Sequence, residues 1–553
     1  MKKYLYFNIL LFIGCLVAPP WGSAMANEAV ASAINQRMEE LLFSGDLEIG
    51  GAEISARDIL PEFYARRAFE PVWTSDEKIR ELGAIIASAP EEGLEIEDYY
   101  QDELRQLAAQ TRESRSPADI ADLDILLTES LIRSGYHRRF GKVNARLLYP
   151  SINFKRALTE GMDPEAVIQA WIDAGSLQGF LDEKIPRGPL YRALQNALVE
   201  YRAIEASGGW PAVPAGPTMR KGDSDARVVA LRRRLSVTGD LPTGADAASD
   251  LFDDSLVQAV INFQERHALG ADGLVGEQTV IALNVPVQTR IDQLRLSLER
   301  LRWVFDEVTD EFVAVNIAGF RVFVVRDREF IWVSRAMVGK TYRQTPVFRG
   351  DIRYLEMNPT WTVPPGIMRN DILPAIKRDP GYLQAKNMSV IDRNGKHVDP
   401  ATVDWQAYTK GVPYTIRQEP GPNNALGTIK FIFPNEHFVF LHDTPSRGLF
   451  TRDDRAFSSG CIRVEDPLAL AEIVLNDPVK WNRAALEEAV AGRKTMRVNL
   501  TEPMPVLILY LTAMIDPEGR VRFLKDVYGR DQAVLEALNR DVIIDFSDLA
   551  PAT

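Results

Sequence analysis

The spacing of apolar residues differs between the two halves of the chain. From residue 28 to about 205, apolar positions recur at three-and-four spacing, as in "IADLDILLTESLIRSGYHRRF", which predicts amphipathic helices packed together. From about residue 311 the pattern alternates, as in "EFVAVNIAGFRVFVVRDREFIWV", which predicts β-strands of a sheet with one buried face. Two more strands are expected in 428–445, and helices follow residue 466. The chain is therefore expected to be a multidomain α+β protein.

A compact helical unit is predicted between residues 218 and 285. The stretch before it, "ASGGWPAVPAGP", is rich in Gly and Pro and marks a boundary or linker. Val228, Leu231 and Leu235 share one face of a first helix, and a second apolar helix follows. Turn residues at 272–276 precede a last short helix. The pattern alone predicts a three-helix module.

These patterns give a domain plan. Residues 27–210 are expected to form a helical scaffold, 215–288 the three-helix module, 310–500 a mainly-β domain, and 501–553 C-terminal strands and a helix that pack on the rest. A hairpin is expected across Pro517-Glu518-Gly519. Residues 365–425 have many prolines and glycines, and loops of this length are often lids or binding elements. We expect them to be a lid-like insertion.

The N-terminus has the features of an export signal. Lys2 and Lys3 precede an apolar run, and Ala24-Met25-Ala26 has the small-x-small pattern of a cleavage site, so residues 1–26 are predicted to be a signal peptide. A membrane anchor is the alternative, but the run is short for a bilayer and two prolines break it. Lipidation at Cys15 is a second alternative. Cleavage would predict a mature chain in the periplasm with no membrane span.

The net charge and the number of cysteines exclude further classes of function. Removal of two lysines would change the formal net charge from −13 to −15, and an acidic chain is a poor candidate for binding nucleic acid. Cys461 would then be a single cysteine in a compartment where disulfides form, and it cannot make an internal bridge. It is either a small buried hydrophobic residue or a reactive thiol.

A reactive thiol needs a base, because little of it is ionised at neutral pH. Three of the five histidines, His137, His267 and His397, lie in the predicted helices, the module and the insertion. His437 and His442 flank the run "FVFL" and point to opposite faces of a strand. His442 ends that strand just before a turn, so we predict it as the base.

Backbone amides complete the predicted chemistry. Gly460 permits unusual backbone geometry, so the amides of Gly460 and Cys461 are expected to point at a developing oxyanion. A thiol, a base and two amides suffice for acyl transfer. The histidines lack the spacing of metal ligands and no nucleotide-binding loop occurs, so neither a metal nor another cofactor is predicted.

The three-helix unit resembles the peptidoglycan-binding domain that accompanies cell-wall hydrolases and transpeptidases. The resemblance implies a fold, and wall binding only by association. The matching residues are Val228, Leu231, Leu235, Phe252, Asp253, Ala259, Val260, Phe263, Gln264, Leu269, Asp272, Gly273, Val275, Gly276, Thr279 and Leu283.

The region around the cysteine resembles the YkuD-like L,D-transpeptidases, in which a histidine is followed at this distance by Ser/Thr-His-Gly-Cys. Here His442 is followed, fifteen residues on, by Ser458-x-Gly460-Cys461. "NPTWTVPPGI", "RQEPGPNNALGTIKFIFPN" and "CIRVEDP" extend the similarity. In this order the parts look like the large periplasmic L,D-transpeptidases of Gram-negative bacteria. The family's common second histidine is replaced by Ser459, a variant that looks normal in these large members.

The resemblance implies roles for individual residues. Cys461 would be the nucleophile and His442 the base, with the backbone carbonyl of Asp443 orienting the imidazole. A role for the Asp443 carboxylate stays open as the alternative. Arg463 lies two residues past the nucleophile and is predicted to bind a substrate carboxylate, against the alternative of an ordinary surface ion pair. Further residues suggested for the substrate groove are Trp361, Tyr354, Tyr382, Trp405 and Asn424.

The expected function is an L,D-transpeptidase that cross-links third-position diamino acids of peptidoglycan stem peptides and releases D-alanine from a tetrapeptide donor. Its partners would be the stem peptides and glycan, and a carbapenem would be a covalent inhibitor. An L,D-carboxypeptidase, an enzyme that attaches a protein to the wall, and a non-catalytic wall-binding scaffold are the alternatives.

Overall fold

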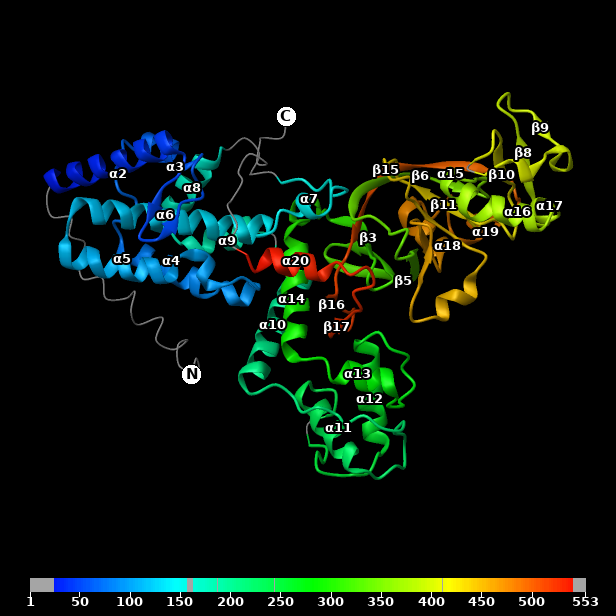
Figure 1. Cartoon of the computed structure of the whole chain (residues 1–553), viewed down its shortest axis with the longest axis horizontal. Helices are drawn as coiled ribbons and strands as arrows, with labels where there is room; N and C mark the ends of the chain where they lie inside the picture. Colours follow the sequence, from blue (N-terminus) through cyan, green and yellow to red (C-terminus); the bar gives the residue numbers. More distant parts are fainter. Residues whose placement is uncertain (1–23, 157–162, 186, 243, 410, 541–553) are drawn as a thin grey trace.

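A computed structural model describes residues 24–156, 163–185, 187–242, 244–409 and 411–540. The helical N-terminal part and the mainly-β part lie at opposite ends of the molecule, and the small helical module lies below them (Figure 1). None of the helices within these ranges has the length and apolar character needed to cross a bilayer. The predicted signal peptide lies outside the described residues up to position 23, and so does Cys15.

The N-terminal part is helical, as predicted. Its longest helix, α6, begins after Ser116, whose Oγ accepts a hydrogen bond from the Asp119 amide at 3.1 Å, with Pro117 in the first turn. A two-stranded ribbon, β1 (Glu48–Ile49) and β2 (Ala52–Glu53), accompanies the helices. The helices are α2 (Ala24–Ser44), α3 (Leu60–Arg66), α4 (Asp76–Ala87), α5 (Gln101–Ser114), α6 (Pro117–Phe140), α7 (Ala145–Leu148), α8 (Pro164–Asp173), α9 (Leu177–Lys184) and α10 (Pro189–Ala206), with 3-10 turns η2 (Ala89–Glu92) and η3 (Ile96–Tyr99).

Helix α14 (Val287–Arg302) stands between the scaffold and the mainly-β domain, and the domain plan above leaves it out. Its sequence, "VQTRIDQLRLSLERLR", has too many charges for an obvious apolar stripe. Arg295, Glu299 and Arg302 are nevertheless buried. The helix is therefore held in place by polar partners as well as by apolar packing.

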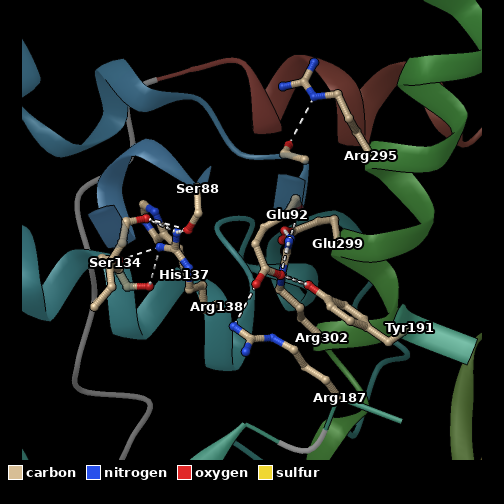
Figure 2. Close-up of polar contacts among 12 residues, drawn as sticks. Ser88, Glu92, Ser134, His137, Arg138, Arg187, Tyr191, Arg295, Glu299 and Arg302 are labelled. Atoms are coloured by element: carbon tan, nitrogen blue, oxygen red, sulfur yellow. Dashed lines mark hydrogen bonds and ion pairs between the residues drawn. The ribbon is translucent and has the colours of Figure 1, made fainter. Parts of the chain in front are cut away.

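A buried polar network joins α14 to the scaffold (Figure 2). Arg302 donates to a Glu299 carboxylate oxygen at 2.9 Å, to the Tyr191 hydroxyl at 3.1 Å and to the Glu92 carbonyl. The Glu92 carboxylate accepts from Tyr191 at 2.5 Å and pairs with Arg187 at 2.7 Å. Burial acts to raise the pKa of Glu92, but the surrounding arginines and Tyr191 outweigh it and the pKa is lowered.

The scaffold and the mainly-β domain share one hydrophobic core, which runs from Val30 to Leu538. The helical module has a separate core, in which Val228, Leu231, Phe252 and Phe263 are buried. Its three helices are α11 (Ala226–Val237), α12 (Asp254–Arg266) and α13 (Glu277–Leu283), which confirms the predicted three-helix unit. The module is therefore an independent packing unit attached to a larger body.

The mainly-β domain is built on a nine-stranded sheet in the order β13-β5-β14-β12-β11-β6-β15-β3-β4. The long strand β5 pairs with β4 along its first part and with β14 near its end, so the sheet closes on itself. The strands are β3 (Glu311–Asn316), β4 (Arg321–Arg326), β5 (Glu329–Gly339), β6 (Phe348–Met357), β11 (Ile429–Ile432), β12 (Leu441–His442), β13 (Ala456–Ser458), β14 (Ile462–Val464) and β15 (Met496–Leu509). Helices α18 (Pro467–Leu475) and α19 (Arg483–Ala491) follow the cysteine, as predicted.

The predicted insertion is a folded subdomain with its own core, of which Val363, Leu373 and Ile416 are buried members. It has a four-stranded sheet in the order β7-β10-β8-β9, whose strands are only two to four residues long. Strands this short show no clear alternation in the sequence. Its elements are β7 (Trp361–Thr362), α15 (Pro365–Ile367), the π-helix η5 (Met368–Ile372), α16 (Leu373–Arg378), α17 (Tyr382–Ala385), β8 (Met388–Ile391), β9 (His397–Val398) and β10 (Thr415–Gln418).

The domain boundary predicted at residue 500 falls inside β15, which pairs with both β6 and β3. Residues up to 509 therefore belong to the main sheet, and the predicted boundary is wrong in this respect. The hairpin expected across 517–519 is present as β16 (Ala513–Ile515) and β17 (Val521–Phe523). Helix α20 (Asp531–Leu538) follows it and packs on α14.

Candidate active site

Strand pairing brings the predicted nucleophile and base to neighbouring positions. β12 and β14 are parallel neighbours, with Leu441 opposite Ile462 and His442 opposite Arg463. Residues opposite each other on paired strands share a face, as do residues two apart on one strand. Cys461, Arg463 and His442 therefore lie on the same face of the sheet. The other face carries the apolar partners Ile462, Leu441 and Val464, which are buried in the core.

The His442 imidazole is buried and oriented by backbone. Its Nδ1 lies 2.5 Å from the Asp443 carbonyl oxygen, which assigns the proton to Nδ1 and leaves Nε2 with a lone pair. Burial is the main reason why the pKa of His442 is lowered to about 3, and the positive charge of Arg463 adds to this effect. The carbonyl of Asp443 thus takes the orienting position that the family resemblance implied.

The Cys461 thiol is half-buried and neutral. Its Sγ lies 3.7 Å from the Phe438 carbonyl oxygen. Burial raises the pKa of Cys461 to about 11, although the Phe440 amide and the charges of Lys430 and Arg463 favour the thiolate. The resting pair is consequently a neutral thiol beside a neutral imidazole. A thiol in this state needs a base to remove its proton before it can act as a nucleophile.

The loop before the cysteine is held by internal hydrogen bonds. Gly460 has φ of +118°, a conformation that other residues adopt with strain. Its N–H donates to Ser458 Oγ at 3.1 Å, and its carbonyl accepts from Thr345 at 2.8 Å. This differs from the expectation that both amides point at an oxyanion, because the Gly460 amide is already used. Among the described residues, the Cys461 amide has no acceptor and is the one left for that role.

Ser459 connects the loop to the lid-like subdomain. The Arg343 guanidinium donates to Ser459 Oγ at 2.9 Å and to an Asp371 carboxylate oxygen at 2.8 Å. Asp371 lies in η5 of the subdomain. The serine at the position of the family's second histidine therefore takes part in a bridge between the catalytic loop and the lid-like subdomain.

Lys430 is a site residue that the sequence reasoning missed. It lies on β11 opposite His442 and opposite Glu356 of β6, so it shares the face of the nucleophile. Its ammonium group lies 4.0 Å from the centre of the Phe440 ring. Burial lowers the pKa of Lys430. The alternation in "TIKFIF" placed a lysine on the polar face, but only the strand order brings it next to the cysteine.

The Arg463 side chain forms no hydrogen bond or ion pair with the described residues, and its Nε is buried without a partner. Burial lowers the pKa of Arg463, while the nearby thiol acts in the opposite direction. The predicted alternative, an ordinary surface ion pair, does not occur among these residues. Such a guanidinium is suited to a substrate carboxylate.

Other predicted residues are placed differently. The Asp443 carboxylate is used by Thr428 and Arg447, so it braces the turn and approaches Gly427 too closely for any side chain there. Asn424 is buried, and its amide donates to the carbonyls of Pro359 and Glu419, which argues against direct substrate contact. The Tyr354 ring lies on the polar face under the Arg497 guanidinium, 3.7 Å from it. Trp361, Tyr382 and Trp405 pack on the core of the lid-like subdomain.

No group of His, Cys, Asp and Glu side chains suited to a metal ion occurs in the part of the chain that the structure describes. The fold and the site together define a class: a thiol on a closed β-sheet, beside a backbone-oriented histidine, in a chain with a helical scaffold and a separate helical module. A thiol and a neighbouring base are the groups that acyl transfer by a cysteine requires.

Comparison with known families identifies the domains. The L,D-transpeptidase catalytic domain of the YkuD family matches residues 310–489, the scaffold domain matches 58–198, and a "Putative peptidoglycan binding domain" matches 224–283. The chain therefore carries a YkuD-type L,D-transpeptidase catalytic domain together with a scaffold domain and a peptidoglycan-binding domain.

Two related proteins are consistent with this set of domains. A Haemophilus influenzae protein named "Putative L,D-transpeptidase" is 35% identical over 282 residues, which are 50% of this chain and 57% of that protein. The N-acetylmuramoyl-L-alanine amidase CwlM of Mycobacterium tuberculosis is 43% identical over 75 residues, 12% of this chain and 18% of the amidase. The chain thus spans less than two thirds of the length of either relative.

Two solved structures show weak likeness. An L,D-transpeptidase from Xylanimonas cellulosilytica is 14% identical with a TM-score of 0.18 and covers 53% of this chain and 98% of its own. A fused Zn-dependent amidase/peptidase/peptidoglycan-binding protein from Clostridium acetobutylicum is 13% identical with a TM-score of 0.15 and covers 53% of this chain and 100% of its own. At these TM-scores the likeness carries no argument about this chain.

Proposed function

We propose that the chain is an L,D-transpeptidase that cross-links the third-position diamino acids of peptidoglycan stem peptides through a cysteine acyl-enzyme. The observation that carries this proposal is the shared face of Cys461, His442 and Arg463 on the paired strands β12 and β14. The catalytic-domain and peptidoglycan-binding matches support the substrate class.

In the first half-reaction, Cys461 Sγ attacks the carbonyl between the diamino acid and the terminal D-alanine of a tetrapeptide. Nε2 of His442 takes the thiol proton as the C–S bond forms, and the Cys461 amide faces the oxyanion. The C–N bond then breaks, and the imidazolium gives its proton to the leaving amine of D-alanine. Lys430 and Arg463 favour the negative charge that develops on sulfur during attack.

In the second half-reaction, a free amine of a neighbouring stem attacks the thioester. His442 accepts a proton from that amine and returns one to sulfur, which restores the thiol. Water as acceptor would make the same acyl-enzyme an L,D-carboxypeptidase, and an amine of a protein would attach that protein to the wall. The unpaired Arg463 supports a donor with a free carboxylate near the reacting bond.

Incubation with disaccharide-tetrapeptide followed by mass analysis tests the proposal. A dimer with loss of D-alanine is expected from the wild type, and neither dimer nor tripeptide from Cys461→Ala. His442→Ala should lose at least about 100-fold in rate, as expected for a general base. The matched control is His397→Ala, an exposed histidine of the lid-like subdomain.

Different products decide between the proposals. Tripeptide without dimer would replace the transpeptidase by the carboxypeptidase, and equal conversion by wild type and Cys461→Ala would reject the nucleophile. No conversion by either protein, with retained binding to the wall, would favour the non-catalytic scaffold. A carbapenem is expected to add covalently to Cys461, and an unmodified intact mass would contradict the acyl-enzyme.

We also propose that the chain acts in the periplasm after export. The pattern of residues 1–26 supports this, and so does a substrate that lies outside the cytoplasm. Cell fractionation together with the N-terminal sequence of the mature protein tests it. An intact N-terminus in the cytoplasmic fraction would contradict the proposal.

A further inference from the structure

A cleft of about 1110 Å³ lies between three parts of the molecule, away from Cys461. One wall is the loop of the peptidoglycan-binding module around 269–279. The others are the start of β4 with the loop 450–455, and the hairpin of β16 and β17. The hairpin lies between the module and the main sheet (Figure 1).

The cleft is lined by seven acidic and seven basic side chains, and the basic ones include a cluster of arginines, Arg321, Arg335, Arg455 and Arg522. Arg321 of β4 lies directly opposite Arg335 of β5, and like charges in that position repel. Arg335 is neutralised by Glu465 at 2.7 Å, and Arg455 donates to backbone carbonyls. The side chains of Arg321 and Arg522 form no hydrogen bond or ion pair with the residues that the structure describes.

The electrostatics of the cluster agree with this geometry. Burial and then the neighbouring Arg335 lower the pKa of Arg321, while Glu518, Asp516 and Glu465 act in the opposite direction. Burial and then Arg321 lower the pKa of Arg522, while Asp516 and Glu265 act in the opposite direction. Burial, Arg321 and Arg335 together lower the pKa of Arg455 to about 10. The guanidinium groups are therefore within electrostatic range of one another, and a bound anion would relieve their repulsion.

The carboxylates nearest the hairpin are already engaged. Arg520 holds Asp516 at 3.0 Å, Glu265 at 3.5 Å and Glu518 at 3.7 Å. The same contacts tie the hairpin to α12 of the module. These groups therefore fix one wall of the cleft and leave Arg321 and Arg522 for an external ligand.

The cleft lies on the same side of the sheet as the nucleophile. Arg463 is the middle residue of β14, and Cys461 and Glu465 immediately flank that strand at alternate positions. Glu465 pairs with Arg335, and Arg335 lies opposite Arg321. A ligand that occupies the cleft would consequently lie on the face where the acyl transfer is proposed to occur.

We propose that this cleft binds peptidoglycan, with Arg321 and Arg522 holding a carboxylate of a stem peptide and the loop 269–279 contacting the adjoining part of the strand. The ligand is an anionic peptide with its glycan, and the guanidinium pair supplies charge-assisted hydrogen bonds to it. The inference rests on the proposed function for the identity of this ligand.

Hydrogen-deuterium exchange of the full chain reports ligand binding at the cleft and at the active site separately. The chain carries Cys461→Ala, which prevents turnover. Disaccharide-tetrapeptide is expected to slow exchange in residues 318–326 and 516–525. Arg321→Gln with Arg522→Gln should raise the concentration for half protection about tenfold or more, the effect of losing a charge-assisted hydrogen bond. Arg233→Gln with Arg353→Gln removes two exposed arginines elsewhere and should leave it unchanged.

Three further probes test the chemistry of the ligand. Disaccharide without peptide, disaccharide-tetrapeptide with amidated carboxyls, and inorganic phosphate should each protect the cleft at least about tenfold more weakly. Equal protection by any of them, no protection at all, or an unchanged response of the arginine variant would overturn the proposal. Arg522→Gln alone provides the same test if the double variant does not fold.

Failure of this inference and failure of the proposed function give different results. Protection of residues 438–463 without protection of the cleft rejects the second site and retains the catalytic proposal. Protection of the cleft alone retains the second site. If, in addition, a carbapenem forms no adduct with Cys461 of the wild type, the proposed acyl transfer is rejected.

Discussion

Acylation of Cys461 by a carbapenem is expected to be nearly independent of pH between about pH 6 and 9. The pKa of Cys461 is raised to about 11 by burial, so about one molecule in 10⁴ carries a thiolate at pH 7. The pKa of His442 is lowered to about 3, so the imidazole stays neutral over the whole range. Both groups keep their protonation states, and a base-assisted attack keeps its rate.

Two histidine variants distinguish base-assisted attack from attack by a free thiolate. A free thiolate would react about tenfold faster for each pH unit, or about 1000-fold faster at pH 9 than at pH 6. His442→Gln leaves only this route and should show that slope, whereas His397→Gln should keep the flat profile. Rates are measured by rapid mixing and intact mass. A wild-type rate that rises tenfold per pH unit would refute the neutral thiol–imidazole pair.

Three further predictions address the surroundings of the site. Lys430→Gln should slow acylation about tenfold, because a positive charge that favours the thiolate is lost, and Lys430→Arg should restore most of the rate; an unchanged rate in Lys430→Gln would exclude this role. Glu92→Gln should lower the free energy of unfolding by about 3–5 kcal/mol at pH 7, since it leaves Arg187 and Arg302 buried without their carboxylate, whereas the exposed Glu91→Gln should have little effect. Because the pKa of Glu92 is lowered from its usual value of 4.5, the stabilisation by the carboxylate is present above pH 4.5 and is lost as the pH falls through the lowered pKa. Denaturant unfolding measures the stability difference between wild type and Glu92→Gln at pH 7 and at pH 3, and equal differences at the two pH values would contradict this reasoning. Gly460→Ala should cost about 1–3 kcal/mol of backbone strain and slow acylation, whereas Gly448→Ala, which has open space around it, should do neither, as thermal unfolding and the acylation rate would reveal.

The three-helix module and the strands of the main sheet follow local patterns that the sequence shows directly. The module repeats apolar positions at helical spacing, and its turn residues mark where each helix ends. Helix α14 does not follow such a pattern, because its charged residues are buried with partners from α10 and η2. The short strands of the lid-like subdomain also lack a pattern, since two to four residues are too few to show alternation.

In the candidate site, too, some features could be predicted from the sequence and others depend on the fold. Cys461 and His442 could be chosen from the sequence, because one cysteine and five histidines leave few alternatives and the strand period assigns their faces. The amide of Gly460 was expected at the oxyanion, but a hydrogen bond to Ser458 uses it. Asn424 was expected in the groove, but its amide holds the loop instead. Such local hydrogen bonds depend on loop geometry that residue type alone does not specify.

The sequence by itself indicated which residues are proposed to carry the chemistry, the face of the strand on which each lies, and the kinds of domain that surround them. Only the tertiary structure decided that β11, β12 and β14 are neighbours, which places Lys430 and Arg463 beside the thiol. It also decided that Arg321 and Arg522, some 200 residues apart in the chain, line one cleft. Alternation along a strand is a local property of the backbone, whereas strand order and the packing of separate domains depend on contacts between distant segments.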